Sequence, residues 1–158
     1  MATLATSAAS GAIIRHDPDF EPDEQPVRFA YLSPAAHVWC RTIFPGMAQD
    51  RGRNETPFEQ VEQVLFEFAI GRPMAYGQQY KKLDPLAQHV WEIKTPDVRL
   101  IGWFARKSCF IVVRAEMKKQ LLQFKLYQPL IQSTVAFRTA LDLDPPKEIA
   151  GVRHDDVL

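Results

Sequence analysis

The stretch that decides the predicted fold is residues 81–119, KKLDPLAQHVWEIKTPDVRLIGWFARKSCFIVVRAEMKK. Proline at position 96 cannot donate to a strand ladder, and the break at 106–108 is short enough for a hairpin loop. These two breaks separate three runs rich in β-branched and aromatic residues, at positions 90–93, 98–105 and 109–115. The stretch therefore predicts three neighbouring antiparallel strands.

The same stretch is basic. It carries nine lysine and arginine residues against four carboxylates, an excess of five positive charges. The chain of 158 residues nevertheless has no net charge, because residues 1–26 hold five carboxylates and a single arginine, Arg15. A basic body is compatible with a nucleic acid or an acidic protein as partner, and equally with an ordinary solvated surface.

The overall composition is that of a soluble globular protein. Hydrophobic residues make up 46% and charged residues 24%, and no apolar run approaches the roughly 20 residues that a membrane span needs. The first residues lack the basic start of a secretory signal, so we expect a cytoplasmic protein without membrane association. Cys40 and Cys109 are far apart in sequence and the histidines are scattered, which predicts core thiols and no metal site.

The order of the remaining segments predicts one α+β domain. Residues 1–26 lack periodicity and end in alternating acids and prolines, so we expect a disordered acidic leader. The domain itself covers 27–143, and residues 144–158 are predicted to form an irregular tail. An apolar–polar alternation at 27–31 predicts a strand of the same antiparallel sheet.

Three helices are predicted around this sheet. One spans 35–44 behind Ser33-Pro34, and a second spans 57–70 behind the capping box of Thr56 and Glu59. Their apolar stripes predict a helix pair packed on one face of the sheet. A last helix begins near Pro129, whereas residues 120–128 fit neither the helical nor the strand period.

This order of strand, helix pair and three-stranded meander resembles the RelE/ParE superfamily of bacterial toxins, and within it the HigB-like, phage-derived branch. The resemblance covers about residues 27–141. It implies a RelE-like fold, with an N-terminal strand and helix pair on a small antiparallel sheet and a C-terminal helix. The residues that carry it are Lys82-Leu83, Val90-Trp91-Glu92-Ile93-Lys94, Val98-Arg99-Leu100-Ile101, the apolar run 109–113 and Lys118-Lys119.

The resemblance implies the toxin of a type II toxin–antitoxin system that cuts mRNA on the ribosome. Its partners would be the ribosome, mRNA and a cognate antitoxin that covers the basic face, and neither a cofactor nor a small-molecule ligand is expected. Attack of a ribose 2′-hydroxyl on the next phosphate needs a proton acceptor, a cation for the pentavalent phosphate and a donor for the leaving oxygen. By position in the family pattern, Arg99 would clamp the phosphate and Lys94 would transfer protons. Further RNA contacts would come from Lys118, Lys119, Arg114 and Lys82.

The same residues allow plainer interpretations. Arg99 can pair with Glu92 across the sheet, and Trp91 and Trp103 can pack in the core or stack on a base. Arg114 stands where relatives often have histidine, Glu116 adds an acid beside the predicted site, and Tyr127 is the one candidate for the family's C-terminal tyrosine. Two alternatives follow, a catalytically inactive RelE-fold interaction module and a ParE-like gyrase inhibitor.

Overall fold

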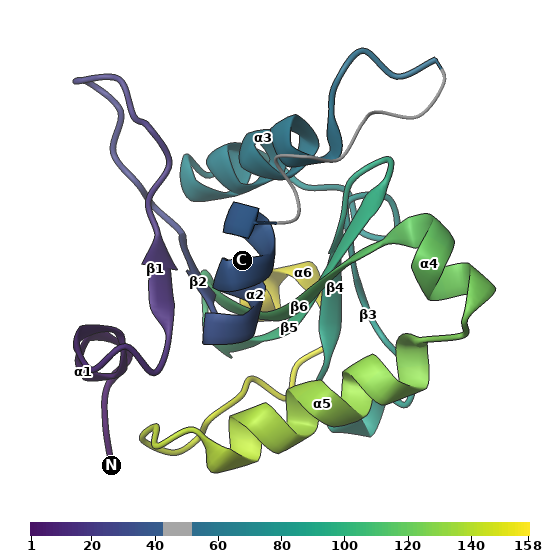
Figure 1. Ribbon diagram of the computed structural model, residues 1–158. Helices are drawn as coiled ribbons and strands as arrows, with labels where there is room; N and C mark the ends of the chain where they lie inside the picture. The colour runs from purple at the N-terminus through teal and green to yellow at the C-terminus, as the bar shows by residue number, and fades with distance from the viewer. Residues whose placement is uncertain (43–51) are drawn as a thin grey trace.

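The computed structural model describes residues 1–42 and 52–158, in which a six-stranded sheet lies between two layers of helices (Figure 1). The strand order is β1-β2-β6-β5-β4-β3. The described strands are β1 (Ile14–His16), β2 (Phe29–Leu32), β3 (Tyr80–Lys82), β4 (Trp91–Lys94), β5 (Val98–Arg106) and β6 (Cys109–Met117). The helices are α1 (Leu4–Ala9), α2 (Pro34–Thr42), α3 (Pro57–Ala69), η2 (Leu86–Gln88), α4 (Lys118–Gln123), α5 (Tyr127–Ala140) and α6 (His154–Val157).

The sheet is mixed, so the expectation of a purely antiparallel sheet is wrong. Strand β2 pairs in parallel with β6, placing Phe29 opposite Cys109, whereas the other described pairs are antiparallel. The chain reverses direction at each turn of the meander from β3 to β6, and β6 runs in the same direction as β2. The three strands predicted from 81–119 are confirmed as β4, β5 and β6.

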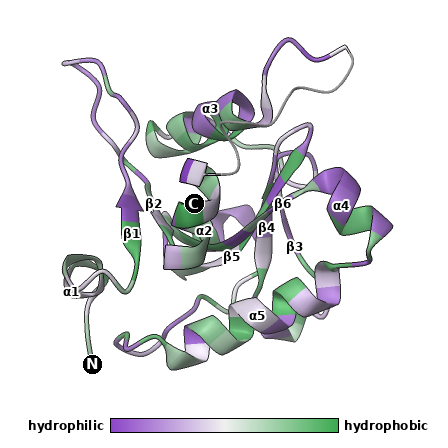
Figure 2. Cartoon of the chain, viewed as in Figure 1, coloured by the Kyte–Doolittle hydropathy of each residue, from purple (hydrophilic) through white to green (hydrophobic). Residues whose placement is uncertain are grey.

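The two faces of the sheet carry separate cores. Helices α2, α3 and α6 cover one face, where Phe68, Trp91 and Phe104 are buried. Helices α4 and α5 cover the other face around Ile101, and α1 packs nearby beside Trp103. Figure 2 shows hydrophobic and hydrophilic residues interleaved along α3 and α5, as expected for helices with one buried side.

The second predicted helix is confirmed as α3. The Thr56 hydroxyl accepts from the Glu59 amide and the Glu59 carboxylate accepts from the Thr56 amide, so both halves of the capping box form. The first predicted helix is observed up to Thr42, and its last two expected residues, with residues 46–51 of the following loop, lie outside the described part. The last helix starts at Tyr127, two residues before the predicted position.

Residues 1–26 differ from the expected disordered leader. They contain α1 and β1, and β1 pairs antiparallel with β2 through Arg15 opposite Tyr31. The Ile13 side chain is fully buried in the core around Trp103. One buried isoleucine beside a three-residue strand gives no periodic signal in sequence, yet it anchors the segment on the sheet.

The C-terminal residues also differ from the expected irregular tail. They include the single-turn helix α6, and Val157 is fully buried under the face that carries α3. The Ser108 amide donates to the Val157 carbonyl, which ties α6 to the hairpin between β5 and β6. The segment is therefore part of the packed domain.

The unassigned residues 120–128 contain the end of α4 and the start of α5. Leu121 is buried, whereas Leu122 and Phe124 are exposed, so the apolar residues there do not share one face. None of the described helices is long and apolar enough to cross a membrane. Cys40 and Cys109 are unbonded and half-buried, and burial raises the pKa of the Cys40 thiol to about 12.

Candidate nucleic-acid interface

The turn between β4 and β5 is held against α3 by one buried glutamine. The Gln60 Oε1 atom accepts from the Thr95 hydroxyl at 2.9 Å and from the Asp97 amide at 2.9 Å, and its Nε2 donates to Asp97 Oδ2 at 2.7 Å. These three buried hydrogen bonds tie the turn to α3 and hold the adjoining ends of β4 and β5. Lys94 and Arg99, the two predicted catalytic residues, lie opposite one another at these ends.

Lys94 and Arg99 converge on the carboxylate of Glu92. Lys94 Nζ lies 3.6 Å from Glu92 Oε1 and donates to the Gly77 carbonyl at 2.9 Å. Arg99 Nε lies 3.9 Å from Glu92 Oε2, so the pairing that the sequence left open is present. Arg99 Nη1 donates to the carbonyls of Thr95 and Val98 at 2.6 and 2.9 Å. The residue is buried.

Tyr127 completes this cluster from the start of α5. Its hydroxyl donates to Glu92 Oε2 at 2.8 Å. Burial, followed by the hydrogen bond to Glu92, raises the pKa of Tyr127 to about 12. The hydroxyl therefore keeps its proton at neutral pH and acts as a donor that orients Glu92. The structure thus adds Tyr127 from the start of α5 to a cluster whose other members lie on the neighbouring strands β4 and β5.

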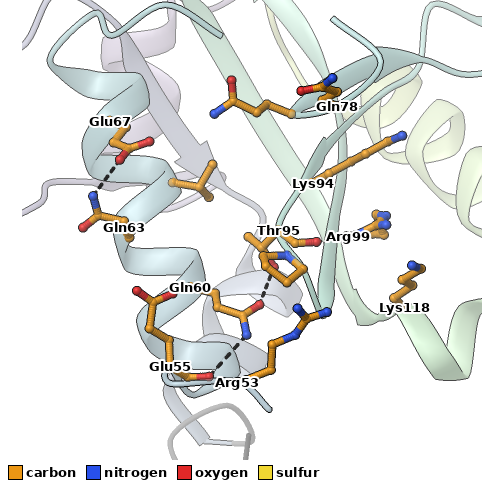
Figure 3. A pocket seen from close by; sticks show the side chains of 13 residues that line it. Arg53, Glu55, Gln60, Gln63, Glu67, Gln78, Lys94, Thr95, Arg99 and Lys118 are labelled. Carbon is orange, nitrogen blue, oxygen red and sulfur yellow. Dashed lines mark hydrogen bonds between the residues drawn. The ribbon is translucent and has the colours of Figure 1, made fainter. Parts of the chain in front are cut away.

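A cavity of about 520 Å³ opens beside this cluster, between α3 and the ends of β4 and β5 (Figure 3). Three of the predicted site residues, Lys94, Arg99 and Lys118, line it together. Its wall on α3 is polar, and two carboxylates, Glu55 and Glu67, offset part of the positive charge. The other lining residues are Arg53, Gln60, Gln63, Val64, Gln78, Gln79, Thr95 and Pro96.

Lys119 lies in an adjoining hollow of about 250 Å³. The hollow shares Arg53, Pro96 and Lys118 with the larger cavity and continues along α4 to Leu122. Its floor contains Asp97, whose Oδ1 lies 3.4 Å from Arg53 Nε. The post-sheet lysine pair of the sequence pattern thus borders one continuous depression.

No family model, curated protein or solved structure matches this chain. Among the described residues, histidine, cysteine and carboxylate side chains form no group of three or more that could hold a metal ion.

Arg114 does not join the cavity. It is exposed on β6 and lines a separate hollow of about 480 Å³ between the start of α2 and α5. Arg99 pairs with Glu116 on β6, so Arg114 is displaced by two positions along the strand and faces a different opening. An RNA contact from Arg114 would have to lie outside the cavity.

Lys82 is not available to a phosphate in this structure, so its assignment as an RNA contact needs correction. Only 2% of the residue is exposed, and Nζ donates to the carbonyls of Ala150 and Gly151, at 3.1 Å each. The same nitrogen contacts His89 Nδ1 at 3.0 Å. Burial lowers the pKa of Lys82, and the residue ties β3 to the C-terminal segment.

Trp91 and Trp103 are fully buried, which confirms that they pack in the core and excludes base stacking on them. Trp91 stacks on Tyr80, and Trp103 Nε1 donates to the Lys147 carbonyl at 2.8 Å. The residue that sequence reasoning missed is Gln60. A polar residue beside Val61 and Val64 in an otherwise apolar helical stripe was the signal that could have revealed it.

Proposed function

We propose that this chain is a RelE-like toxin of a type II toxin–antitoxin system, which cuts ribosome-bound mRNA without a metal ion. The observation that carries the proposal is the shared cavity of Lys94, Arg99 and Lys118. These cations come from β4, β5 and α4, and all three belong to the sequence pattern that predicted the site. Three cations that converge on one polar cavity suit a bound phosphodiester.

The arrangement supports a division of roles during attack of the 2′-hydroxyl on phosphorus. Arg99 stabilises the charge of the pentavalent phosphate, and its orientation is fixed in advance by the Thr95 and Val98 carbonyls. The proton of the attacking 2′-hydroxyl passes to solvent water in the open cavity, and Lys94, the less buried of the pair, protonates the leaving 5′-oxygen. Glu92, held by Tyr127, keeps both cations positioned. Lys118 binds an adjacent phosphate at the rim.

The experiment compares mRNA cleavage in a translation extract and growth inhibition for wild type, Arg99→Ala and the exposed control Lys107→Ala. Loss of one preorganised charge-assisted contact lowers the rate by about a hundredfold or more. Arg99 is largely buried, so the thermal midpoint of the variant is measured in parallel. Lys94→Ala is a second variant, because the Lys94 side chain is more exposed than that of Arg99 and its removal disturbs the packing less. A wild-type protein that leaves translated mRNA intact, or an Arg99→Ala protein that cuts at the wild-type rate, contradicts the proposal.

One observation favours the catalytically inactive interaction module as second candidate. Arg99 is enclosed by two carbonyls and Glu92, and only 11% of its side chain is exposed. A guanidinium held in this way can serve the stability of the strand pair alone. Absence of cleavage together with stable binding of an antitoxin encoded next to this chain would favour this candidate. The ParE-like alternative predicts inhibition of gyrase supercoiling instead.

A further inference from the structure

Strand β6 has a neighbouring strand on both sides only along its first half. Its parallel pairing with β2 ends where Leu32 lies opposite Val112. The chain leaves the sheet at Ser33, whose amide donates to the Val112 carbonyl at 2.8 Å and whose hydroxyl donates to the Val113 carbonyl at 2.7 Å. Within the described part of the chain, no strand continues β2 beside residues 113–117, which we call the open edge of β6.

The backbone groups of Ala115 point toward the empty side of this open edge. On β5, Val98 faces away from β6, because its amide donates to the Thr95 hydroxyl at 2.9 Å and its carbonyl accepts from the Thr95 amide at 3.0 Å. Backbone groups alternate in direction along a strand, so Leu100 faces away from β6 as well. Ala115 lies opposite Leu100, and its N–H and C=O groups therefore point away from β5.

No hydrogen bond from a described residue reaches the Ala115 backbone on that side. The residue is nevertheless buried, with 7% of its surface exposed. Buried backbone donors and acceptors are nearly always paired, because an unpaired group loses its hydrogen bonds to water without replacement. The N–H and C=O groups of Ala115 thus call for a partner from outside the described chain.

The open edge of β6 is the floor of a groove between α2 and α5, which pack on opposite faces of the sheet (Figure 1). The groove consists of a hollow of about 480 Å³ that begins at Ser33 and one of about 190 Å³ that includes Ala115. Its apolar walls include Trp39 on α2 and Leu130 and Phe137 on α5. The two hollows share three lining residues, Ala35, Arg114 and Ser133.

The charged residues that line this groove are Arg114 and Glu116. Arg114 is exposed, and no described residue forms a hydrogen bond or an ion pair with its guanidinium group. Glu116 Oε1 accepts from the Met117 amide at 3.0 Å, so this carboxylate already has a donor. A single carboxylate opposite Arg114 would gain a partner, whereas a polyanion such as RNA would also be repelled by Glu116.

We propose that an extended segment of a partner protein binds in this groove as an additional strand, pairing its backbone with Ala115 and placing one carboxylate against Arg114. An open strand edge binds extended peptides through main-chain hydrogen bonds, and pockets beside it select alternate side chains. The apolar walls favour β-branched or aromatic residues in the bound segment. The groove is separate from the cavity of Lys94 and Arg99, so binding there is independent of the proposed catalytic function.

The probe is a labelled peptide of about seven residues in which valine and threonine alternate around a central aspartate, with a central lysine in the matched peptide. Fluorescence anisotropy on the full chain measures binding, and amide hydrogen exchange reports on Ala115. We expect the aspartate peptide to bind and to slow exchange of the Ala115 amide. Arg114→Glu should weaken binding of the aspartate peptide by about tenfold and strengthen that of the lysine peptide. Lys107→Glu, the same charge change at an exposed residue between β5 and β6, is the matched control.

A second variant tests the groove itself. Ala35 is exposed on α2 and borders both hollows, so Ala35→Trp should fill the groove and abolish binding without disturbing the core. Affinity that Arg114→Glu and Ala35→Trp leave unchanged overturns the proposal, as does Ala115 exchange that the aspartate peptide at about 1 mM does not slow. Slowed exchange that depends on the concentration of the chain without peptide also overturns it, because a second copy is then the occupant.

Discussion

Two strand lysines with the same charge have opposite surroundings in this molecule. Lys82 of β3 is enclosed by the C-terminal segment, with its ammonium group on the carbonyls of Ala150 and Gly151. Lys94 of β4 borders the cavity and retains a fifth of its side-chain exposure. Whether a strand lysine supports the fold or faces a ligand is thus decided by which distant segment covers it.

Replacing these two lysines by alanine gives the largest contrast that we predict. Lys82→Ala leaves two carbonyls without their donor and removes the stem that packs near Trp91, so it should lower the free energy of unfolding by about 3 kcal/mol. Lys94→Ala should lower it by less than about 1 kcal/mol. Urea unfolding of both variants measures the difference. Equal losses would show that the two lysines are equivalent in the fold.

Releasing the β4–β5 turn from α3 by replacing Gln60 should have a smaller effect on the free energy of unfolding. Gln60→Ala leaves the Asp97 carboxylate, its amide and the Thr95 hydroxyl without a buried partner, which should cost about 2 kcal/mol. Gln63→Ala, one turn away and exposed, is the matched control and should cost no more than about 0.5 kcal/mol. We also expect mRNA cleavage to decrease in Gln60→Ala, because Lys94 and Arg99 flank the turn. Thermal unfolding and cleavage assays test both statements, and an unchanged midpoint would exclude a role for Gln60 in fixing the site.

The smallest expected effect concerns Tyr127 and alkaline pH. Its folded-state pKa is raised from 10.0 to about 12, so the stability that the neutral hydroxyl contributes is complete below pH 10 and is lost as the pH rises through 12. Tyr127→Phe should cost about 1 kcal/mol at neutral pH. The deficit should shrink between pH 10 and 12, because Tyr127 ionises there in the unfolded protein and the wild type loses its advantage. Other groups that titrate in this range contribute equally to both proteins. Urea titrations at a series of pH values provide the measurement, and a constant deficit would contradict the assigned hydrogen bond.

Local signals in the sequence were sufficient for the centre of the fold. The capping box of Thr56 and Glu59 located α3, and the alternation of residues from 90 to 115 located three strands. Both signals arise from contacts within a few residues. Strand β1 was missed because its partner β2 lies beyond a turn-rich stretch, and its main anchor is the single side chain of Ile13.

The candidate site was predictable only in part, for the same reason. Family position suggested Lys94, Arg99 and Lys118, and these line one cavity. The same reasoning selected Lys82, which the C-terminal segment covers, and Arg114, which faces another hollow. Charge is visible in a sequence, whereas the tertiary contact that covers or exposes a charge is not.

The parallel pairing of β2 with β6 has a consequence for synthesis of the chain. Phe29 finds its strand partner only at Cys109, after α2, α3 and the other strands of the meander have been made. Distant pairings of this kind carry a large loop-closure entropy and form late. A nascent chain that ends before β6 therefore cannot complete the sheet around β1 and β2, and their edges stay open to other proteins in the interval.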